Sequence, residues 1–182
     1  MNWTIPGTVL QADRAAAANI ESQFTAMFLG GGITLSQIAE VTGLESYTVQ
    51  NWVKRGFLVP PQHKKYNLNQ FCRIININML KKVLPMEQIV GLLTHINGKL
   101  GDTSDDLVDD SQLYFMFVRL AAQARNIGDE ASWQEALHQI AAEYQEPVPG
   151  AREKLLDVLR IMLTAWIAAT LHDAAERMVA QL

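Results

Sequence analysis

Cysteine is almost missing from this chain: Cys72 is the single cysteine among 182 residues. One thiol cannot form a disulfide within the chain, and it cannot supply the several sulfur ligands of a structural zinc site. The histidines do not compensate, because no metal-ligand spacing relates His63, His95, His138 and His172. We therefore expect no metal, no cofactor and a reducing, cytoplasmic environment.

Long hydrophobic runs are also lacking. The first residues, MNWTIPGTVLQADR, have neither the basic start nor the apolar stretch of a signal peptide. The most apolar late run, IMLTAWIAATLH, is shorter than the ~20 residues that cross a bilayer. Charged residues bound this run on both sides, so we expect a buried core helix there and no membrane segment.

Patterns that carry catalysis are absent too. The sequence has no Gly-x-Ser-x-Gly elbow, no cysteine–histidine pair and no paired-carboxylate pattern. The triple glycine at 30–32 is not followed by the Gly-Lys-Ser/Thr of a phosphate loop. The aspartates between 102 and 110 lack the Asp-x-Asp-x-Asp-Gly spacing of a calcium loop. We predict that the protein is not an enzyme and has no catalytic residue.

What is present is an uneven distribution of charge. The net charge is -4, but residues 1–100 carry nine Lys/Arg and five Asp/Glu, whereas residues 101–182 carry six and fourteen. The first part is therefore +4 and the second -8. Such a split suggests two regions with different partners.

Helical periodicity covers most of the chain, and the alternation typical of strands is short everywhere. We predict an all-α fold in which a small two-stranded wing is the one β element. The expected helices span residues 8–29, 35–42, 47–55, 68–83, 86–97, 111–126, 129–144 and 151–181.

Two of these helices are short and closely connected. Thr34 with Gln37 forms a capping-box pattern, and Gly43 suits the left-handed residue that ends a helix. Ser46 is the expected N-cap of the second helix. Two short helices joined by a glycine-containing turn predict a helix-turn-helix. The apolar residues that should hold the second helix on the core are Val49, Trp52 and Val53.

The phrase ITLSQIAEVTGLESYTVQNWVKRGFLVPP, which starts at residue 33, resembles the opening of the DNA-binding domain of MerR-type regulators. That family has a first helix, a Thr-Gly turn, a recognition helix and an exit that ends in proline. KKYNLNQFCRI and VLPMEQIVGLL are similar to the wing, third helix and fourth helix that follow. The resemblance covers residues 33 to 97 and implies a winged helix-turn-helix that binds DNA.

A narrower resemblance covers nearly the whole chain. NWVKRGFLVPP, INMLKKVLPMEQI and SDDLVDDSQLY are similar to the bacterial domain-of-unknown-function family numbered 1836. It implies the same fold and a DNA-binding role. One departure from the MerR-type pattern concerns the recognition helix, where those proteins carry Arg-Tyr-Tyr and this chain has Gln50, Asn51 and Trp52.

These patterns divide the chain into four parts. We expect an N-terminal helix and glycine break in 1–32, a winged helix-turn-helix DNA-binding domain in 33–98, an acidic linker in 99–110 and a helical C-terminal region for dimerisation or an effector in 111–182. An effector of unknown identity, a small molecule or a protein, would bind at these last helices. Their aromatic side chains are Tyr114, Phe115, Phe117, Trp133 and Trp166.

The recognition helix and the wing supply the candidate DNA contacts. Outward polar side chains near the N-terminal half of a recognition helix face the major groove, and amide side chains can bond bidentately to adenine. The candidate base-reading residues are Tyr47, Thr48, Gln50 and Asn51. The candidate phosphate contacts are Lys54, Arg55, His63, Lys64 and Lys65. Between residues 45 and 82, seven Lys/Arg accompany one Glu, a local charge of +6.

The sequence thus predicts a transcriptional regulator that binds double-stranded DNA as a homodimer. A purely structural explanation of this charge is that Lys54 and Arg55 lie at the C-terminal end of a helix, where positive charge interacts favourably with the helix dipole. A functional alternative is a protein–protein adaptor whose helix-turn-helix does not bind DNA. The missing recognition-helix arginine and the large apolar C-terminal helices motivate that alternative.

Overall fold

The computed structural model describes residues 2–102, 104–124 and 130–182, and most of them are helical. These residues form eight α-helices, one 3-10 helix and four short strands arranged in two small sheets. The prediction that the fold is mainly helical is therefore confirmed. Every strand is two or three residues long, so packing between helices forms the core.

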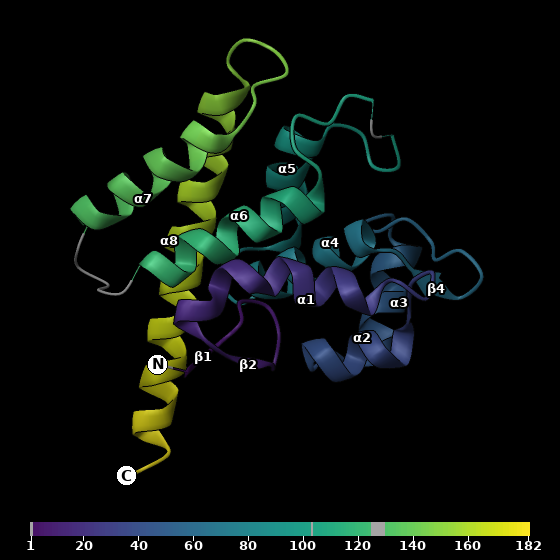
Figure 1. The fold of residues 1–182 in the computed structure, drawn as a ribbon. Coiled ribbons are helices and arrows are strands. Elements are labelled where there is room, and N and C mark those ends of the chain that lie inside the picture. Colours follow the sequence, from purple (N-terminus) through teal and green to yellow (C-terminus); the bar gives the residue numbers. More distant parts are fainter. Residues whose placement is uncertain (1, 103, 125–129) are drawn as a thin grey trace.

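The helices are arranged between two ends of the molecule. Figure 1 places α2 (Leu35–Thr42) and α3 (Ser46–Lys54) at one end, and α7 (Glu130–Glu143) with the upper half of α8 (Ala151–Val179) at the other. Between them lie α4 (Leu68–Leu80), α5 (Met86–Asn97) and α6 (Asp110–Gln123). The expected recognition helix and the acidic C-terminal helices are therefore well separated.

The N-terminal segment departs from the helix expected over residues 8–29. Its first residues form an antiparallel pair of strands, β1 (Asn2–Thr4) and β2 (Gln11–Asp13), followed by the 3-10 helix η1 (Arg14–Asn19) and α1 (Ile20–Met27). The backbone N–H of Ile5 donates to the Leu10 carbonyl at 2.9 Å and closes the turn between the strands. Gly7 in this turn has a φ of 75°, and a Cβ there would collide with Ile75 of α4. Packing on α4 thus outweighs the local helical propensity of residues 8–13.

The pair α2–α3 follows the sequence prediction closely. The Thr34 N–H donates to Gln37 Oε1 at 2.9 Å, the Gln37 N–H donates to Thr34 Oγ1 at 3.4 Å, and Gly43 has a φ of 68°. α3 begins one residue earlier than expected, so Glu45 rather than Ser46 is the N-cap, and no side-chain capping bond is formed there.

The small sheet at this end is not a simple hairpin. β3 (Ile33–Thr34) precedes α2, and it pairs antiparallel with β4 (Lys65–Tyr66), with Ile33 opposite Tyr66. The expected wing strand is therefore attached to the segment before the first helix. This pairing closes a loop around α2 and α3, and α2 packs against both α3 and α4.

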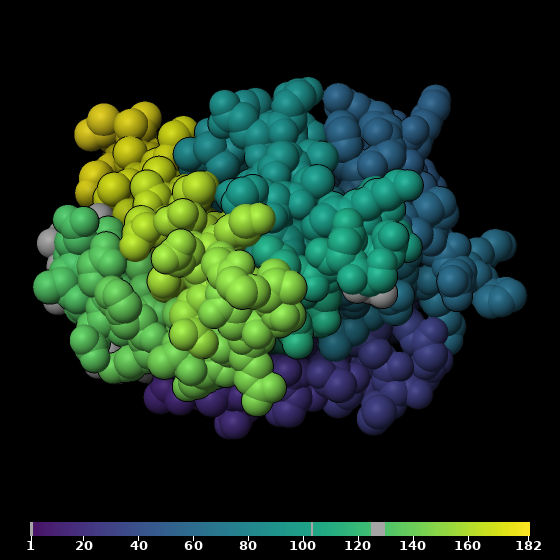
Figure 2. Space-filling view, turned by 90° about the horizontal axis from the view of Figure 1, so that it is seen from above, coloured from purple at the N-terminus to yellow at the C-terminus, as the bar shows by residue number. Residues whose placement is uncertain are grey.

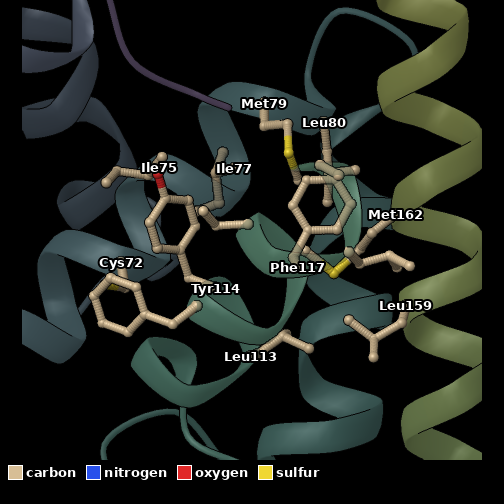
Figure 3. Packing of buried hydrophobic residues seen from close by; sticks show 14 of the residues in the cluster. Cys72, Ile75, Ile77, Met79, Leu80, Leu113, Tyr114, Phe117, Leu159 and Met162 are labelled. Atoms are coloured by element: carbon tan, nitrogen blue, oxygen red, sulfur yellow. The ribbon is translucent and has the colours of Figure 1, made fainter. Parts of the chain in front are cut away.

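The core is centred on α4, in which every residue from Phe71 to Ile77 is buried. An Asn67–Gln70 capping box begins this helix, as predicted, and it ends at Leu80 rather than at residue 83. Figure 3 shows side chains of α4, α6 and α8 meeting, including Tyr114 and Phe117. Burial raises the pKa of the Cys72 thiol well above its ordinary range, so this cysteine is an unreactive core residue.

The same buried cluster runs across the expected linker at 99–110. It joins residues of α2–α5 to residues of α6–α8, and the Tyr114 hydroxyl donates to the Pro6 carbonyl at 3.0 Å. Three of the aromatic side chains considered for an effector site, Tyr114, Phe115 and Phe117, are buried in this core. The division into a DNA-binding domain and a C-terminal region stays a prediction.

Helix α8 is long and apolar enough to cross a membrane by length and composition alone, with a mean hydropathy of 1.4 over its most apolar window. However, 44% of that window is buried in the fold. Its buried side chains, such as Leu159 and Met162, pack against the rest of the core (Figure 3). Burial in the core therefore accounts for part of the apolar run that the sequence displays.

Candidate nucleic-acid interface

The outer face of α3 carries a continuous polar stripe. Tyr47, Gln50, Asn51 and Lys54 follow one another at the i, i+3, i+4, i+7 spacing of one helix face, and all four are exposed. Tyr47 is 64% exposed, which is unusual for so large a side chain. Thr48, the fourth expected base-reading residue, is half-buried beside this stripe. The hydroxyl and amide groups of this stripe are therefore accessible to a ligand.

The inner face of α3 fixes its orientation. Val49 is fully buried, Trp52 is 5% exposed and Val53 is half-buried against the core. The Lys81 ammonium lies 5.7 Å from the centre of the Trp52 ring. Partial burial, followed by the nearby Lys82 charge, lowers the pKa of Lys81. Trp52 is therefore a core residue, with its ring also contacted by a cation, and is not available as a stacking surface.

A tight turn projects next to α3. Gln62 and Lys65 exchange two backbone hydrogen bonds, of 3.0 and 2.8 Å, around His63 and Lys64. The φ angles of these two central residues are 48° and 62°, which defines a type I′ turn. Neither residue is glycine, so each conformation costs on the order of 1 kcal/mol. The turn presents both side chains to solvent.

Lys65 connects this turn to the triple glycine. Its Nζ donates to the Gly30 carbonyl at 2.8 Å. Gly32 has a φ of 112°, and a Cβ at that position would lie 2.7 Å from the Tyr66 carbonyl oxygen. The glycine break is thus required for the close approach of β3 and β4.

Arg55 stands at the C-terminal end of α3. Its Nη2 lies 3.9 Å from Glu87 Oε1, and its Cζ lies 4.6 Å from the centre of the Phe57 ring. The two charged side chains are 59% and 79% exposed, and such solvent-exposed pairs contribute only ~0–1 kcal/mol. Arg55 could therefore exchange Glu87 for a phosphate at little cost.

Two other basic residues of this region are committed to carboxylates. The Nη1 of Arg73, a buried side chain on α4, lies 3.2 Å from Asp110 Oδ2, and its Nε donates to the Phe57 carbonyl at 2.9 Å. The Lys82 ammonium lies 2.7 Å from Asp173. The local charge of +6 between residues 45 and 82 therefore overstates the positive charge that this region presents at the protein surface. Sequence reasoning missed the pair at Arg73 because Asp110 is 37 residues away, although the apolar neighbours of Arg73 indicate a buried site.

The structure brings the expected contacts together at one end of the molecule. Figure 1 places α3 and the 62–65 turn at the same end, and Figure 2 shows the segment near residue 60, coloured blue, standing out from that end. The exposed cations of this surface, which we call the basic end, are Lys54, Arg55, Lys64 and Lys65, with His63 between them. Such a surface suits a polyanion.

Among the described residues, three side chains place possible metal-ligand atoms within 4.8 Å of one another. This group lies far from the basic end. The three side chains are those of His172, Asp173 and Glu176, near the end of α8. Both oxygens of Asp173 already accept hydrogen bonds from Lys82, at 2.7 and 2.9 Å. These side chains are therefore better described as a surface ion-pair cluster.

Comparisons with known proteins find one family and a distant relative. The family model described as "Domain of unknown function (DUF1836)" matches residues 23–117, a stretch that contains all the residues of the basic end. The "Uncharacterized protein YkrK" of Bacillus subtilis (strain 168) is 29% identical over 143 residues, which is 76% of this chain and 61% of that protein. The chain thus spans about three-fifths of the length of this relative. No solved structure matches the chain significantly.

Proposed function

The chain belongs to the DUF1836 family, and we propose that it is a DNA-binding transcriptional regulator with a MerR-like winged helix-turn-helix. In this proposal α2 and α3 form the helix-turn-helix, α3 enters the major groove and the 62–65 turn is the tip of the wing. The observation that carries the proposal is the joint exposure, at one end of the molecule, of the α3 polar stripe and the turn's cations.

The α3 stripe supports base recognition. The major groove admits an α-helix, and the N-terminal residues of a recognition helix contact base edges. Gln50 and Asn51 can each bond the two groups that adenine displays there, with about 1–3 kcal/mol of discrimination per good pair. Tyr47 precedes them on the same face, and Thr48 stands at its edge. Gln50, Asn51 and Trp52 stand where MerR-type helices carry Arg-Tyr-Tyr, so the phosphate contact of that arginine is not part of this proposal.

The basic end supports phosphate binding. Lys54 and Lys64 are exposed and have no ion-pair partner among the described residues, whereas Arg55 and Lys65 would each give up a weak contact. Four such cations would neutralise about four phosphates, and each one contributes about -0.9 to the slope of log affinity against log salt. This is a weak attraction for one protomer, which is why the proposal includes a homodimer.

The end of α8 supports that homodimer. Leu171, Ala175 and Met178 follow the i, i+4, i+7 spacing of a helix–helix seam, and all are exposed. Figure 1 shows this part of α8 extending beyond the body of the molecule.

Sedimentation of the full chain should give a dimer mass, and Leu171→Glu with Met178→Glu should give a monomer. A monomer mass before substitution would remove the dimer from the proposal.

One observation favours the adaptor alternative. Tyr47 is 64% exposed at the start of the proposed reading surface, and exposed tyrosines are common anchors of protein interfaces. An adaptor of this kind would bind its partner with little dependence on Lys54 and Lys64, because apolar anchors rather than charge would supply the affinity.

Binding of the full chain to duplex DNA tests the proposal. Mixed genomic fragments carry the phosphate backbone that every DNA-binding protein contacts, so they reveal binding before any operator is known. Fluorescence anisotropy at low and at physiological salt should give clear binding at low salt and weaker binding at the higher concentration. The absence of binding at low salt would overturn the regulator and leave the adaptor.

A further inference from the structure

A cleft of about 580 Å³ lies where the N-terminal turn meets the late part of α8, the end of α4 and the turn between α2 and α3. Figure 1 shows β1 and β2 beside the lower half of α8, and the Trp3 and Trp166 rings meet edge to face there, with 6.3 Å between their centres. The volume falls within the range of small-molecule sites. We call this cavity the N-terminal cleft; its lining comes from the segments 3–9, 42–44, 78–82 and 166–177, together with Arg14.

Hydrogen bonds fix the walls of the N-terminal cleft. The Nδ2 of Asn78, on α4, donates to the Gly7 carbonyl at 2.9 Å and to the Thr42 carbonyl at 3.1 Å. The Val9 N–H donates to the Val41 carbonyl at 2.9 Å. These bonds tie the N-terminal turn to the end of α2, so the cleft is formed before any ligand enters it.

One face of α8 supplies a complete wall of the cleft. Trp166, Thr170, Asp173 and Arg177 all line it, and they follow the i, i+4, i+7, i+11 spacing of one helix face. At about 100° per residue, this face is on a different side of α8 from the seam that we propose for the homodimer. A dimer formed through that seam therefore leaves the cleft accessible.

Positive charge dominates the lining of the cleft. Among the described lining residues, four are basic and one is acidic, a net charge of +3. The acidic residue is Asp173, and both of its oxygens accept hydrogen bonds from Lys82, at 2.7 and 2.9 Å. The lining holds no second carboxylate to offset the other three cations, which are Arg14, Lys81 and Arg177. This excess of positive charge selects an anionic ligand.

Several of these cations can be reached by a ligand. Lys81 and Arg177 are exposed, and neither has an ion-pair partner among the described residues. Arg177 is one helical turn beyond Asp173, and Lys82, which bonds Asp173, keeps a third N–H group for another acceptor. Partial burial, followed by the Lys82 charge, lowers the pKa of Lys81. An anion beside these two lysines offsets their mutual repulsion.

The apolar part of the lining selects the body of the ligand. Trp166, one of the aromatic side chains considered for an effector, is half-buried, and Val9 is 53% exposed. Both therefore offer accessible apolar surface inside the cleft. An inorganic ion would leave that surface in contact with water, whereas an aromatic or aliphatic group covers it.

We propose that the N-terminal cleft binds a small organic anion, a carboxylate or phosphate monoester attached to an aromatic or aliphatic body. The anionic group lies against Lys82 and Arg177 with Lys81 nearby, and the body packs on Trp166. Because residues 42–44 belong to the lining, a bound molecule also contacts the turn that leads into the proposed recognition helix. This last consequence rests on the proposed DNA-binding function; the binding site itself does not.

Calorimetry on the full chain with indole-3-acetate, 3-phenylpropionate and phenyl phosphate tests the site. At least one of them should bind at millimolar concentration or better and raise the melting temperature. Indole-3-acetamide and 3-phenylpropionamide replace the carboxylate with a neutral group of similar shape, so they should bind about tenfold more weakly or not at all. If none of the three anions binds, or if the amides bind as well as the acids, the proposal is wrong.

Inorganic phosphate measures what the anionic group contributes without a body. It should bind more weakly than phenyl phosphate, because it covers none of the apolar lining. Equal affinity for the two would show that the cleft does not recognise an organic body and would overturn that part of the proposal.

Two variants locate the bound anion. Arg177→Gln and Lys81→Gln should each weaken binding about tenfold, since each removes a hydrogen bond between charged groups. Both side chains are exposed, so the melting temperature of the empty protein should change little. Lys154→Gln, which removes a charge from the exposed surface of α8 outside the cleft, is the control. Binding that both cleft variants leave unchanged would locate the anion elsewhere and overturn the proposal.

Anisotropy with labelled duplex DNA at matched ionic strength then separates this site from the proposed function. If the anion binds and changes DNA affinity, both ideas are supported. If the anion binds but no DNA is bound under any condition, the site stands and the regulator does not. If DNA affinity is unaffected by a saturated cleft, the link to the α2–α3 turn is wrong. If Lys81→Gln with Arg177→Gln abolishes DNA binding in the absence of a small anion, the cleft is part of the DNA surface and the small-molecule site is wrong.

Discussion

Arg73 on α4 and Asp110 at the start of α6 form a buried ion pair, with 3.2 Å between Nη1 and Oδ2 and with side chains that are 5% and 7% exposed. The pair joins α4 to the first turn of α6. Burial raises the pKa of Asp110, and the Arg73 charge opposes that rise. The two charges are therefore tolerated in the core because they are held together.

Removing one partner of this pair should be far more harmful than removing both. Arg73→Met leaves a buried carboxylate without its cation, and such losses typically cost about 3–5 kcal/mol. Arg73→Met combined with Asp110→Asn leaves no uncompensated charge, so part of the free energy of unfolding should return. Urea denaturation of the wild type, both single variants and the double variant measures this coupling. Equal stability of the single and double variants would contradict it.

Gly32 and Gly30 offer a matched pair of substitutions in the triple glycine. Gly32→Ala should destabilise the β3–β4 pairing by about 1–3 kcal/mol, because it places a Cβ against the Tyr66 carbonyl at a φ of 112°. Gly30→Ala should be harmless, since a Cβ there meets no atom within 4 Å. Thermal denaturation compares them. A harmless Gly32→Ala would show that the strands need no close approach at this point.

The strained turn predicts that stability and DNA binding will change in opposite directions. His63→Asn with Lys64→Gly gives the Asn-Gly pair that type I′ turns prefer, so the free energy of unfolding should rise by about 1 kcal/mol. The same change removes two proposed phosphate contacts, His63 and Lys64, so DNA affinity should fall. Denaturation and anisotropy on one preparation give both values. Unchanged DNA affinity would remove the turn from the interface.

The acidic loop predicts a specific dependence of stability on pH. The pKa of Asp106 rises from its ordinary 3.8 to about 6 on folding, so between these values the folded state holds the proton more tightly. This group therefore favours the folded state below pH 4, and its contribution is lost as the pH rises through 6. Asp106→Asn should raise the melting temperature at pH 7 and have less effect at pH 5. The same effect at both pH values would contradict the shifted pKa.

Features that depend on residues three or four apart could be predicted from the sequence. The capping boxes Thr34–Gln37 and Asn67–Gln70 are both formed, and Gly43 adopts the expected left-handed conformation. A cap involves one turn of backbone, so neighbouring side chains determine it. The exposed and buried faces of α3 could also be predicted, because the helical period alone determines which residues share a face.

Features that depend on distant residues could not be predicted in this way. The strand pairing of Ile33 with Tyr66 and the ion pair of Arg73 with Asp110 join segments more than 30 residues apart. The N-terminal strands replace a predicted helix because Gly7 must pass close to Ile75.

The salt dependence of DNA binding tests the central claim most directly. Affinity for a duplex of mixed sequence is measured between about 50 and 200 mM salt for the full chain, for Lys54→Glu with Lys64→Glu and for Lys154→Glu, a control on exposed α8. We predict a log–log slope of about -3 to -4 per protomer, made shallower by about 2 in the double variant and unchanged in the control. Binding that is absent at the lowest salt, or that is indifferent to the double substitution, would contradict the account.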